Sequence, residues 1–138
     1  MHGQSPDIAL GTDQFGAGDQ GLMFGYACNQ TDTYMPAPLY YSHRITEALT
    51  SVRKQNLVPW LEPDSKSQVT VEYNDDSTVK RIAKVVCSTQ HSESVDIDTV
   101  RSTIREIIVQ VIPEALLDDK TEYLINPTGR FVVGGPDG

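Results

Sequence analysis

A carboxylate, a hydroxyl and an ammonium group stand side by side at Asp64, Ser65 and Lys66, just before a predicted strand. A lysine in such a place can hold phosphate oxygens as a point charge. The alternative is an ordinary solvated lysine, because lysines are mostly exposed on protein surfaces. The chain contains no Gly-x-x-x-x-Gly-Lys sequence, so Lys66 does not belong to the common phosphate-binding loop.

Two further segments carry side chains that suit a ligand. Ser88–Ser92 ends an apolar run with hydrogen-bonding groups, and its His91 is either a base or a structural hydrogen-bonding residue. Thr128–Phe131 combines a turn glycine, a guanidinium and an aromatic ring. That set can stack a flat base and hold it through backbone contacts. The alternative places Phe131 in the core at the start of a strand.

A glycine-rich stretch, Gly16–Gly21, leads into an apolar run and carries Asp19 where the two meet. Glycine adopts positive φ angles and lets a ligand or another backbone come close. Loops on a rigid scaffold often carry function, which makes Asp19 a candidate contact. The alternative is a plain connection with a solvated aspartate.

Composition limits the classes of function. The 138 residues suit one domain, and the net charge of -8 argues against a nucleic-acid partner. No apolar run approaches the ~20 residues of a membrane span. Cys28 and Cys87 lie in apolar runs without metal-type spacing, which predicts reduced thiols in a cytoplasmic protein. The three histidines have no suitable carboxylate spacing, so we expect no complete metal site within the chain.

The elements that must position these residues follow from hydrophobic periodicity and turn signals. Both predicted helices have a single apolar stripe, so we expect them on one face of a mixed sheet in an α+β fold. Two predicted strands are apolar on both sides, so the other face should meet another domain or subunit. The predicted order is β-α-β-β-α-β, with strands at 21–28, 67–73, 79–90 and 121–126, helices at 38–55 and 97–111, and a further strand starting at 131–133.

Taken together, five segments resemble one family in order and with matching gaps. The family is S-adenosylmethionine synthetase (methionine adenosyltransferase), and the resemblance is to its central region across essentially the whole chain. The first and the last motif are long and highly specific. The segments are Gly16–Tyr26, Met35–Pro38, Pro63–Lys66, Ser88–His91 and Ile125–Pro136.

The resemblance implies an alkyl transfer in one-carbon metabolism. The sulfur of L-methionine attacks the 5′ carbon of ATP, and the triphosphate leaves intact before it is hydrolysed to pyrophosphate and phosphate. Mg2+ and K+ assist these enzymes. Their subunits have three related α+β domains and pair through flat sheet faces into dimers or tetramers, with active sites between subunits. That pairing would cover the second face of the sheet here.

The same resemblance implies roles for individual residues. Asp19 would contact the methionine and ribose region of the neighbouring subunit's site. Lys66 would be the catalytic cation on the phosphates, and Gln90 and His91 would line the cleft. The ATP-binding set implied by the family is Asp64, Ser65, Lys66, Ser88, Thr128, Gly129, Arg130 and Phe131.

Departures from the family pattern are as informative as the matches. The family's His-Pro-Asp-Lys segment, which supplies a catalytic histidine and a magnesium-binding carboxylate, would lie upstream, and the mobile lid is absent from these residues. The resemblance therefore implies that residues 1–138 are a single central domain without the N-terminal and C-terminal domains. We expect that this chain alone does not turn over. The alternative is a non-catalytic dimerisation or nucleotide-binding module.

Overall fold

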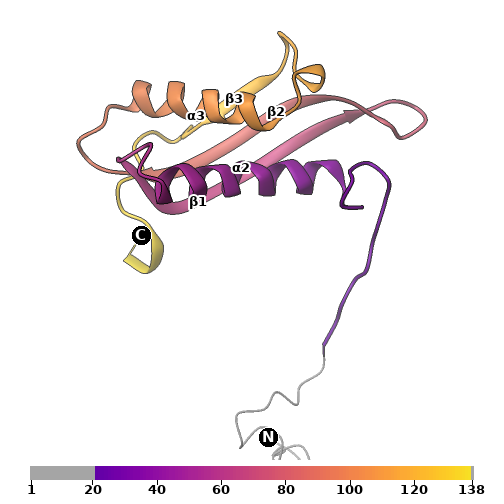
Figure 1. The fold of residues 1–138 in the computed structure, drawn as a ribbon, viewed down its shortest axis with the longest axis horizontal. Coiled ribbons are helices and arrows are strands. Elements are labelled where there is room, and N and C mark those ends of the chain that lie inside the picture. Colours follow the sequence, from indigo (N-terminus) through magenta and orange to yellow (C-terminus); the bar gives the residue numbers. More distant parts are fainter. Residues whose placement is uncertain (1–20, 138) are drawn as a thin grey trace, which may run out of the picture.

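The computed structural model describes residues 21–137, which form two helices, a three-stranded sheet and two short 3-10 turns (Figure 1). This arrangement confirms the α+β fold. The elements are α2 (Ala37–Lys54), β1 (Leu61–Tyr73), β2 (Val79–His91), α3 (Ile97–Val111), η1 (Glu114–Leu116), β3 (Glu122–Ile125) and η2 (Gly135–Asp137).

The sheet is mixed and has the order β1-β2-β3. β1 and β2 form an antiparallel hairpin, and β2 pairs with β3 in parallel. A turn joins β1 to β2, and in it the backbone N–H of Asn74 donates to the Thr78 carbonyl at 2.9 Å. Ser77 adopts a φ of 66° in that turn. The sheet therefore has a central strand, β2, which lies between β1 and β3 over residues Lys84–Cys87.

Both helices cover the same face of the sheet (Figure 1). Alternate residues of β2 point to that face, and Val85, Cys87 and Thr89 are fully buried there. The hydroxyl of Ser67 in β1 donates to the backbone carbonyl of Ser42 in α2 at 2.6 Å. The core lies between the sheet and the helices, as the single apolar stripes predicted. Neither helix of the described part has the length and apolar composition to cross a membrane.

α3 begins and ends at the residues that the sequence predicts. Asp96 caps it, since its carboxylate accepts from the Thr99 N–H at 2.8 Å. Val100, Ile104 and Ile108 form the buried stripe, and all three are fully buried. Because proline cannot continue the helical hydrogen bonds, the pattern stops before Pro113. α2 covers 37–54, one residue earlier at each end than predicted.

The strand predicted at 21–28 is wrong. Leu22, Met23, Phe24 and Tyr26 are 73–91% exposed, and residues 21–28 have no strand structure. The indigo segment instead leads away from the body (Figure 1). An apolar run becomes a strand only when another strand satisfies its backbone groups, and the described residues place none beside it. Asp19 lies outside the described residues.

Other strand predictions differ from the structure: β2 differs by one residue at one end, and β3 differs by one residue at each end. β1 begins at Leu61 rather than 67, because a register shift between Leu61 and Ser65 lets the pairing continue past the irregular stretch. Residues 131–133 form no strand. Phe131 bonds β2 through the backbone and ring of His91, and the Val132 carbonyl accepts from the Gln90 side chain, but no strand ladder forms.

An ion-pair cluster connects the hairpin to the segment before β3. The Arg81 guanidinium donates to both carboxylate oxygens of Asp118, at 2.6 and 2.7 Å, and to Glu72 at 3.2 Å. These bonds from Arg81 lower the pKa of Asp118 from 3.8 to about 2. The carboxylate is therefore more acidic in the folded chain than in the unfolded one.

We expect the stability supplied by Asp118 to be present above about pH 4 and to be lost as the pH falls towards 2. The sign follows because the unfolded state binds the proton more tightly than the folded state. Asp118→Asn should therefore lower the urea midpoint at pH 7, and the difference from the unmodified chain should shrink towards pH 2.5. Asp119→Asn, at an exposed neighbour, is the control. A difference that stays constant with pH would contradict this origin.

Candidate functional site

The sheet face opposite the helices carries the predicted cation. Lys66 of β1 stands directly opposite Ser88 of β2, and opposite residues of an antiparallel pair share a face. Thr89 and His91 are buried on the helix side, so Ser88 and Gln90 point the other way. We call the surface that carries Lys66, Ser88 and Gln90 the open face.

A segment near the C-terminus ties the two strands together on this face. The Gln90 side chain donates to the Val132 carbonyl at 3.0 Å. The Gly135 N–H donates to a carboxylate oxygen of Asp64, also at 3.0 Å. The segment 132–135 therefore runs from β2 to β1. It brings Asp64 into the same end of the open face as Lys66 and Ser88.

Gly134 lies close to both contacts. A Cβ at this position would stand 2.9 Å from Cδ of Gln90 and 3.0 Å from Oδ2 of Asp64. Real Cβ contacts are essentially never as short as the first distance, and the second is tighter than nine in ten of them. Both neighbours are ends of flexible side chains, so they can move, but only by giving up their hydrogen bonds to the segment.

We expect Gly134→Ala to release Asp64 and Gln90 from the segment at a cost of roughly 1 kcal/mol, about that of one ordinary hydrogen bond. Amide resonances of Gln90 and Gly135 should shift, while those of the helix-side core should not. Gly25→Ala is the matched control, because nothing lies within 4 Å of a Cβ there. Equal spectra for Gly134→Ala and the unmodified chain would show that the close approach does not hold in solution.

The structure separates two of the predicted residues from this set. Ser65 stands opposite Thr89, which is fully buried on the helix side, so Ser65 points away from Lys66. His91 is also fully buried on the helix side. The position of His91 favours the structural interpretation of its side chain. Of the residues predicted in the two strands, Asp64, Lys66 and Ser88 therefore lie together, and Ser65 does not lie with them.

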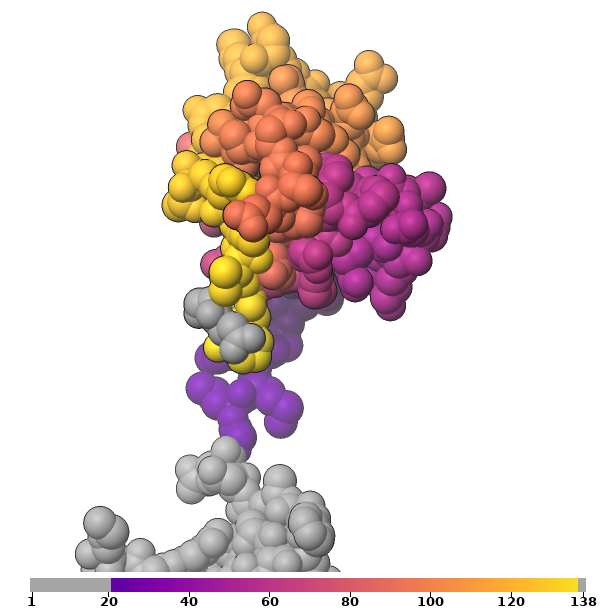
Figure 2. Space-filling model, turned by 90° about the vertical axis from the view of Figure 1, so that its left-hand side faces the viewer, coloured from indigo at the N-terminus to yellow at the C-terminus, as the bar shows by residue number. Residues whose placement is uncertain are grey.

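The loop with the aromatic candidate returns to the same end of the sheet. Gly129 has a φ of 102°, which suits glycine, and Thr128 beside it is exposed. The Arg130 guanidinium donates to the Glu93 carbonyl at 2.7 Å. Figure 2 shows the yellow C-terminal segment beside the orange residues that follow β2. Phe131 is half-buried where the loop rejoins β2.

Asn126 lies within the motif Ile125–Pro136, and its structural role was not predicted. Asn126 is 1% exposed. Its side-chain oxygen accepts from the Thr89 N–H, and its side-chain nitrogen donates to the Thr89 carbonyl, both at 2.9 Å. Its φ of 43° is left-handed, a conformation that asparagine tolerates better than most residues. The Asn-Pro-Thr-Gly turn sequence was the available signal, but it does not reveal the partner.

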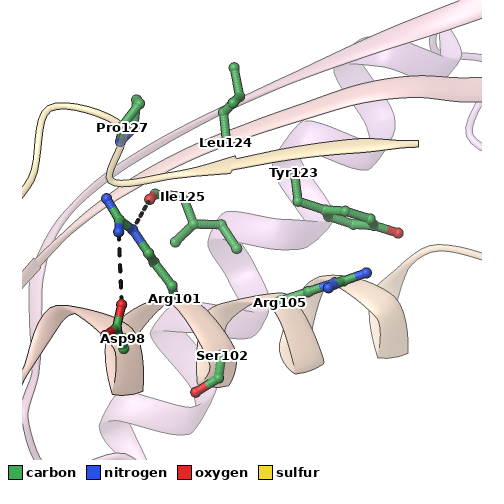
Figure 3. Close-up of a pocket in the computed structure, with 8 residues that line it drawn as sticks. All are labelled: Asp98, Arg101, Ser102, Arg105, Tyr123, Leu124, Ile125 and Pro127. Carbon is green, nitrogen blue, oxygen red and sulfur yellow. Dashed lines mark hydrogen bonds and ion pairs between the residues drawn. The ribbon is translucent and has the colours of Figure 1, made fainter. Parts of the chain in front are cut away.

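A groove of about 560 Å3 runs between α3 and the outer edge of β3 (Figure 3). Arg105 stacks over the Tyr123 ring at 4.8 Å, and Arg101 donates to the Ile125 carbonyl at 3.3 Å. None of the predicted site residues lines the groove. Its two arginines are already engaged with neighbouring groups, which distinguishes them from Lys66.

Other chemistries find little support in the described part. Burial raises the pKa of the Cys87 thiol to about 12, so this cysteine stays protonated and is a poor nucleophile. Within residues 21–137, no group of three or more histidine, cysteine or acidic side chains could hold a metal ion. What this end of the open face offers is a cation, a carboxylate, a hydroxyl and a nearby aromatic residue.

These features define the class: a two-layer α+β domain with helices on one face and a partly polar, open sheet on the other. Residues 14–131 match the family model described as "S-adenosylmethionine synthetase, central domain". The chain therefore belongs to the S-adenosylmethionine synthetase family, as the resemblance of its motifs indicated.

Two curated relatives support this assignment. The S-adenosylmethionine synthase of Syntrophobacter fumaroxidans is 54% identical over 143 aligned residues, which cover 98% of this chain and 36% of the relative. The S-adenosylmethionine synthase of Staphylococcus epidermidis is 48% identical over 151 aligned residues, covering 98% of this chain and 38% of the relative. The chain thus spans little more than a third of the length of these relatives.

Proposed function

We propose that this chain supplies the nucleotide-binding part of a methionine adenosyltransferase. The reaction would form S-adenosylmethionine from ATP and L-methionine and release phosphate and pyrophosphate. The observation that carries the proposal is the convergence of Asp64, Lys66 and Ser88 at one end of the open face. The segment that begins at Phe131 reaches the same end. The family assignment and the relatives' names supply the reaction.

The proposed reaction needs little general acid–base catalysis. A sulfur displaces a triphosphate from carbon, so the main needs are alignment of the two reactants and stabilisation of charge on the leaving oxygens. Lys66 is exposed on the open face, and no carboxylate of the described part forms an ion pair with it. It would therefore be the catalytic cation on the phosphates. Phe131 would stack on the adenine beside Thr128, Gly129 and Arg130.

Asp19 keeps its proposed place at the methionine and ribose region of a neighbouring subunit's site. We assign Mg2+ and K+ to the whole protein rather than to this chain. The described residues do not fit a metal ion by themselves, because they bring together no set of three ligands, and Asp64 accepts a backbone hydrogen bond from Gly135.

A second copy is the proposed partner for the open face. Val86 of β2 and Leu124 of β3 stand side by side on this face, and Leu124 is 40% exposed. Apolar side chains on a flat sheet are stabilised when another layer covers them. We propose that the whole protein is a cytoplasmic homo-oligomer, a dimer or tetramer, that packs through this face.

A chimera tests the proposed function. This chain would replace the matching third of the Syntrophobacter fumaroxidans enzyme, and S-adenosylmethionine formation from ATP and methionine would be measured by chromatography. We expect turnover within about tenfold of the parent enzyme, a loss of less than ~1.4 kcal/mol in transition-state stabilisation. The 138-residue chain alone should give none. A chimera that assembles like the parent and binds ATP without turnover would support a non-catalytic binding module instead.

A further inference from the structure

Beyond the end of β3, backbone groups of β2 still form hydrogen bonds with the residues that follow β3. The Cys87 carbonyl accepts from the backbone N–H of Asn126 at 2.9 Å, and the Asn126 side chain then serves both backbone groups of Thr89. Two residues on, the His91 N–H donates to the Phe131 carbonyl at 2.9 Å. The loop 127–130 thus leaves β2 at Asn126 and returns to it at Phe131.

The ring of His91 makes the second bond to the returning residue. Its Nε2 lies 3.0 Å from the backbone nitrogen of Phe131, and its Nδ1 lies 2.9 Å from the Ser92 carbonyl oxygen. A carbonyl only accepts, so Nδ1 carries the proton and Nε2 accepts from the Phe131 N–H. The two hydrogen bonds together therefore assign the Nδ1–H tautomer to the ring.

These bonds fix Phe131 more firmly than the loop before it. Thr128 and Arg130 are exposed, and the Arg130 bond to the Glu93 carbonyl is exposed as well. Phe131 instead makes two bonds to His91, and the one to the His91 ring is half-buried. The place of the Phe131 backbone, and with it the origin of its side chain, therefore depends on the imidazole.

We propose that His91 is a positioning residue for the nucleotide base. It does not touch the ligand; its neutral Nδ1–H imidazole holds the Phe131 backbone so that the aromatic ring is already in place when the base arrives. A preorganised contact strengthens binding because less ordering is lost on association. The inference rests on the proposed function, in which Phe131 stacks on adenine.

Two substitutions at His91 separate its two bonds. In His91→Gln, the side-chain oxygen reaches about as far as Nε2 and can still accept from Phe131. In His91→Asn, the shorter amide can replace only the bond from Nδ1 to the Ser92 carbonyl. Both variants replace the ring by a buried amide, so the general loss of stability should be similar in the two.

The first measurement uses the 138-residue chain. Nitrogen NMR of unmodified protein should show a protonated Nδ1 and an unprotonated Nε2 at His91. Hydrogen exchange of the Phe131 amide should accelerate about tenfold in His91→Asn and change less than about threefold in His91→Gln, as expected for one lost hydrogen bond. The Val85 amide reports global stability. The opposite tautomer, or equal acceleration in both variants relative to Val85, would overturn the positioning bond.

The second measurement uses the chimera. His91→Asn should raise KM for ATP about tenfold and leave kcat and KM for methionine within about threefold, since base binding is made equally in ground and transition states. His91→Gln should stay close to the unmodified chimera. A purely structural role would lower the active fraction, and hence kcat, in both variants. If both variants lose kcat in a chimera that is otherwise active, only the role of His91 is overturned. If the unmodified chimera is inactive, the proposed function is overturned, and with it the idea that Phe131 is positioned for a nucleotide base.

Discussion

Replacing Lys66 by methionine in the chimera is expected to lower kcat by about 10²–10³-fold, the usual loss when one preorganised charge contact to a transition state is removed. Lys66 stands opposite Ser88 on the open face and has no ion-pair partner in the described part of the chain. Its charge is therefore free to meet phosphate oxygens. Methionine keeps the length and apolar character of the stem, so folding should change little.

Lys84→Met is the matched control for this prediction. Lys84 lies on the same face of the sheet, opposite Thr70, and its ammonium pairs with Glu122 at 2.9 Å. It is four residues from Ser88 along β2, about 13 Å at the usual rise of a strand. Steady-state kinetics and native mass spectrometry would compare the two variants. Turnover of Lys66→Met within tenfold of the unmodified chimera, or an equal loss in Lys84→Met, would contradict the assignment of Lys66 as the catalytic cation.

The local elements could be predicted because their signals lie within a few residues of one another. The buried stripe of α3, with Asp96 before it and Pro113 after it, fixes that helix in the sequence alone. The hairpin follows from alternating residues on either side of an Asn-Asp-Asp-Ser turn. Pairing across a short turn involves no distant partner, so propensity and structure agree.

The segment 21–28 could not be predicted in the same way. Its apolar composition favours a covered position, but a strand forms only beside a second strand. The two helices, the hairpin and β3 assemble without it, and its side chains stay exposed. Composition therefore indicates that a segment favours an apolar cover. Only the observed strand pairing shows whether the described residues provide one.

The roles of the candidate site residues stay predictions, and only their placement can be compared with the structure. Resemblance brought Asp64, Lys66 and Ser88 together, and the pairing of β1 with β2 agrees with that grouping. Ser65 was misplaced, although the alternation that buries Val69 on the helix side already implies that Ser65 points the same way. The role of Asn126 could not have been predicted, because a single side chain that bonds the β2 backbone in place of a neighbouring strand produces no periodic sequence pattern.

Asn126→Ala is expected to lower the free energy of unfolding of the 138-residue chain by roughly 2–4 kcal/mol. The change leaves the buried N–H and C=O of Thr89 without their partners, and each buried unsatisfied group costs about 1–3 kcal/mol. Urea unfolding followed by circular dichroism would measure the loss. Part of this loss of stability comes from the backbone, because alanine adopts a φ of 43° less readily than asparagine.

Asn126→Gly separates these two causes. Glycine adopts the left-handed conformation without strain, so the part of the loss that remains in this variant belongs to the missing amide. We expect roughly 1.5–3 kcal/mol to remain. Asn74→Ala in the exposed hairpin turn, where the amide bonds only the Thr78 hydroxyl, should cost within about 0.5 kcal/mol. If Asn126→Gly proved as stable as the unmodified chain, water would satisfy Thr89 as well as the amide does, and Asn126 would not extend the sheet.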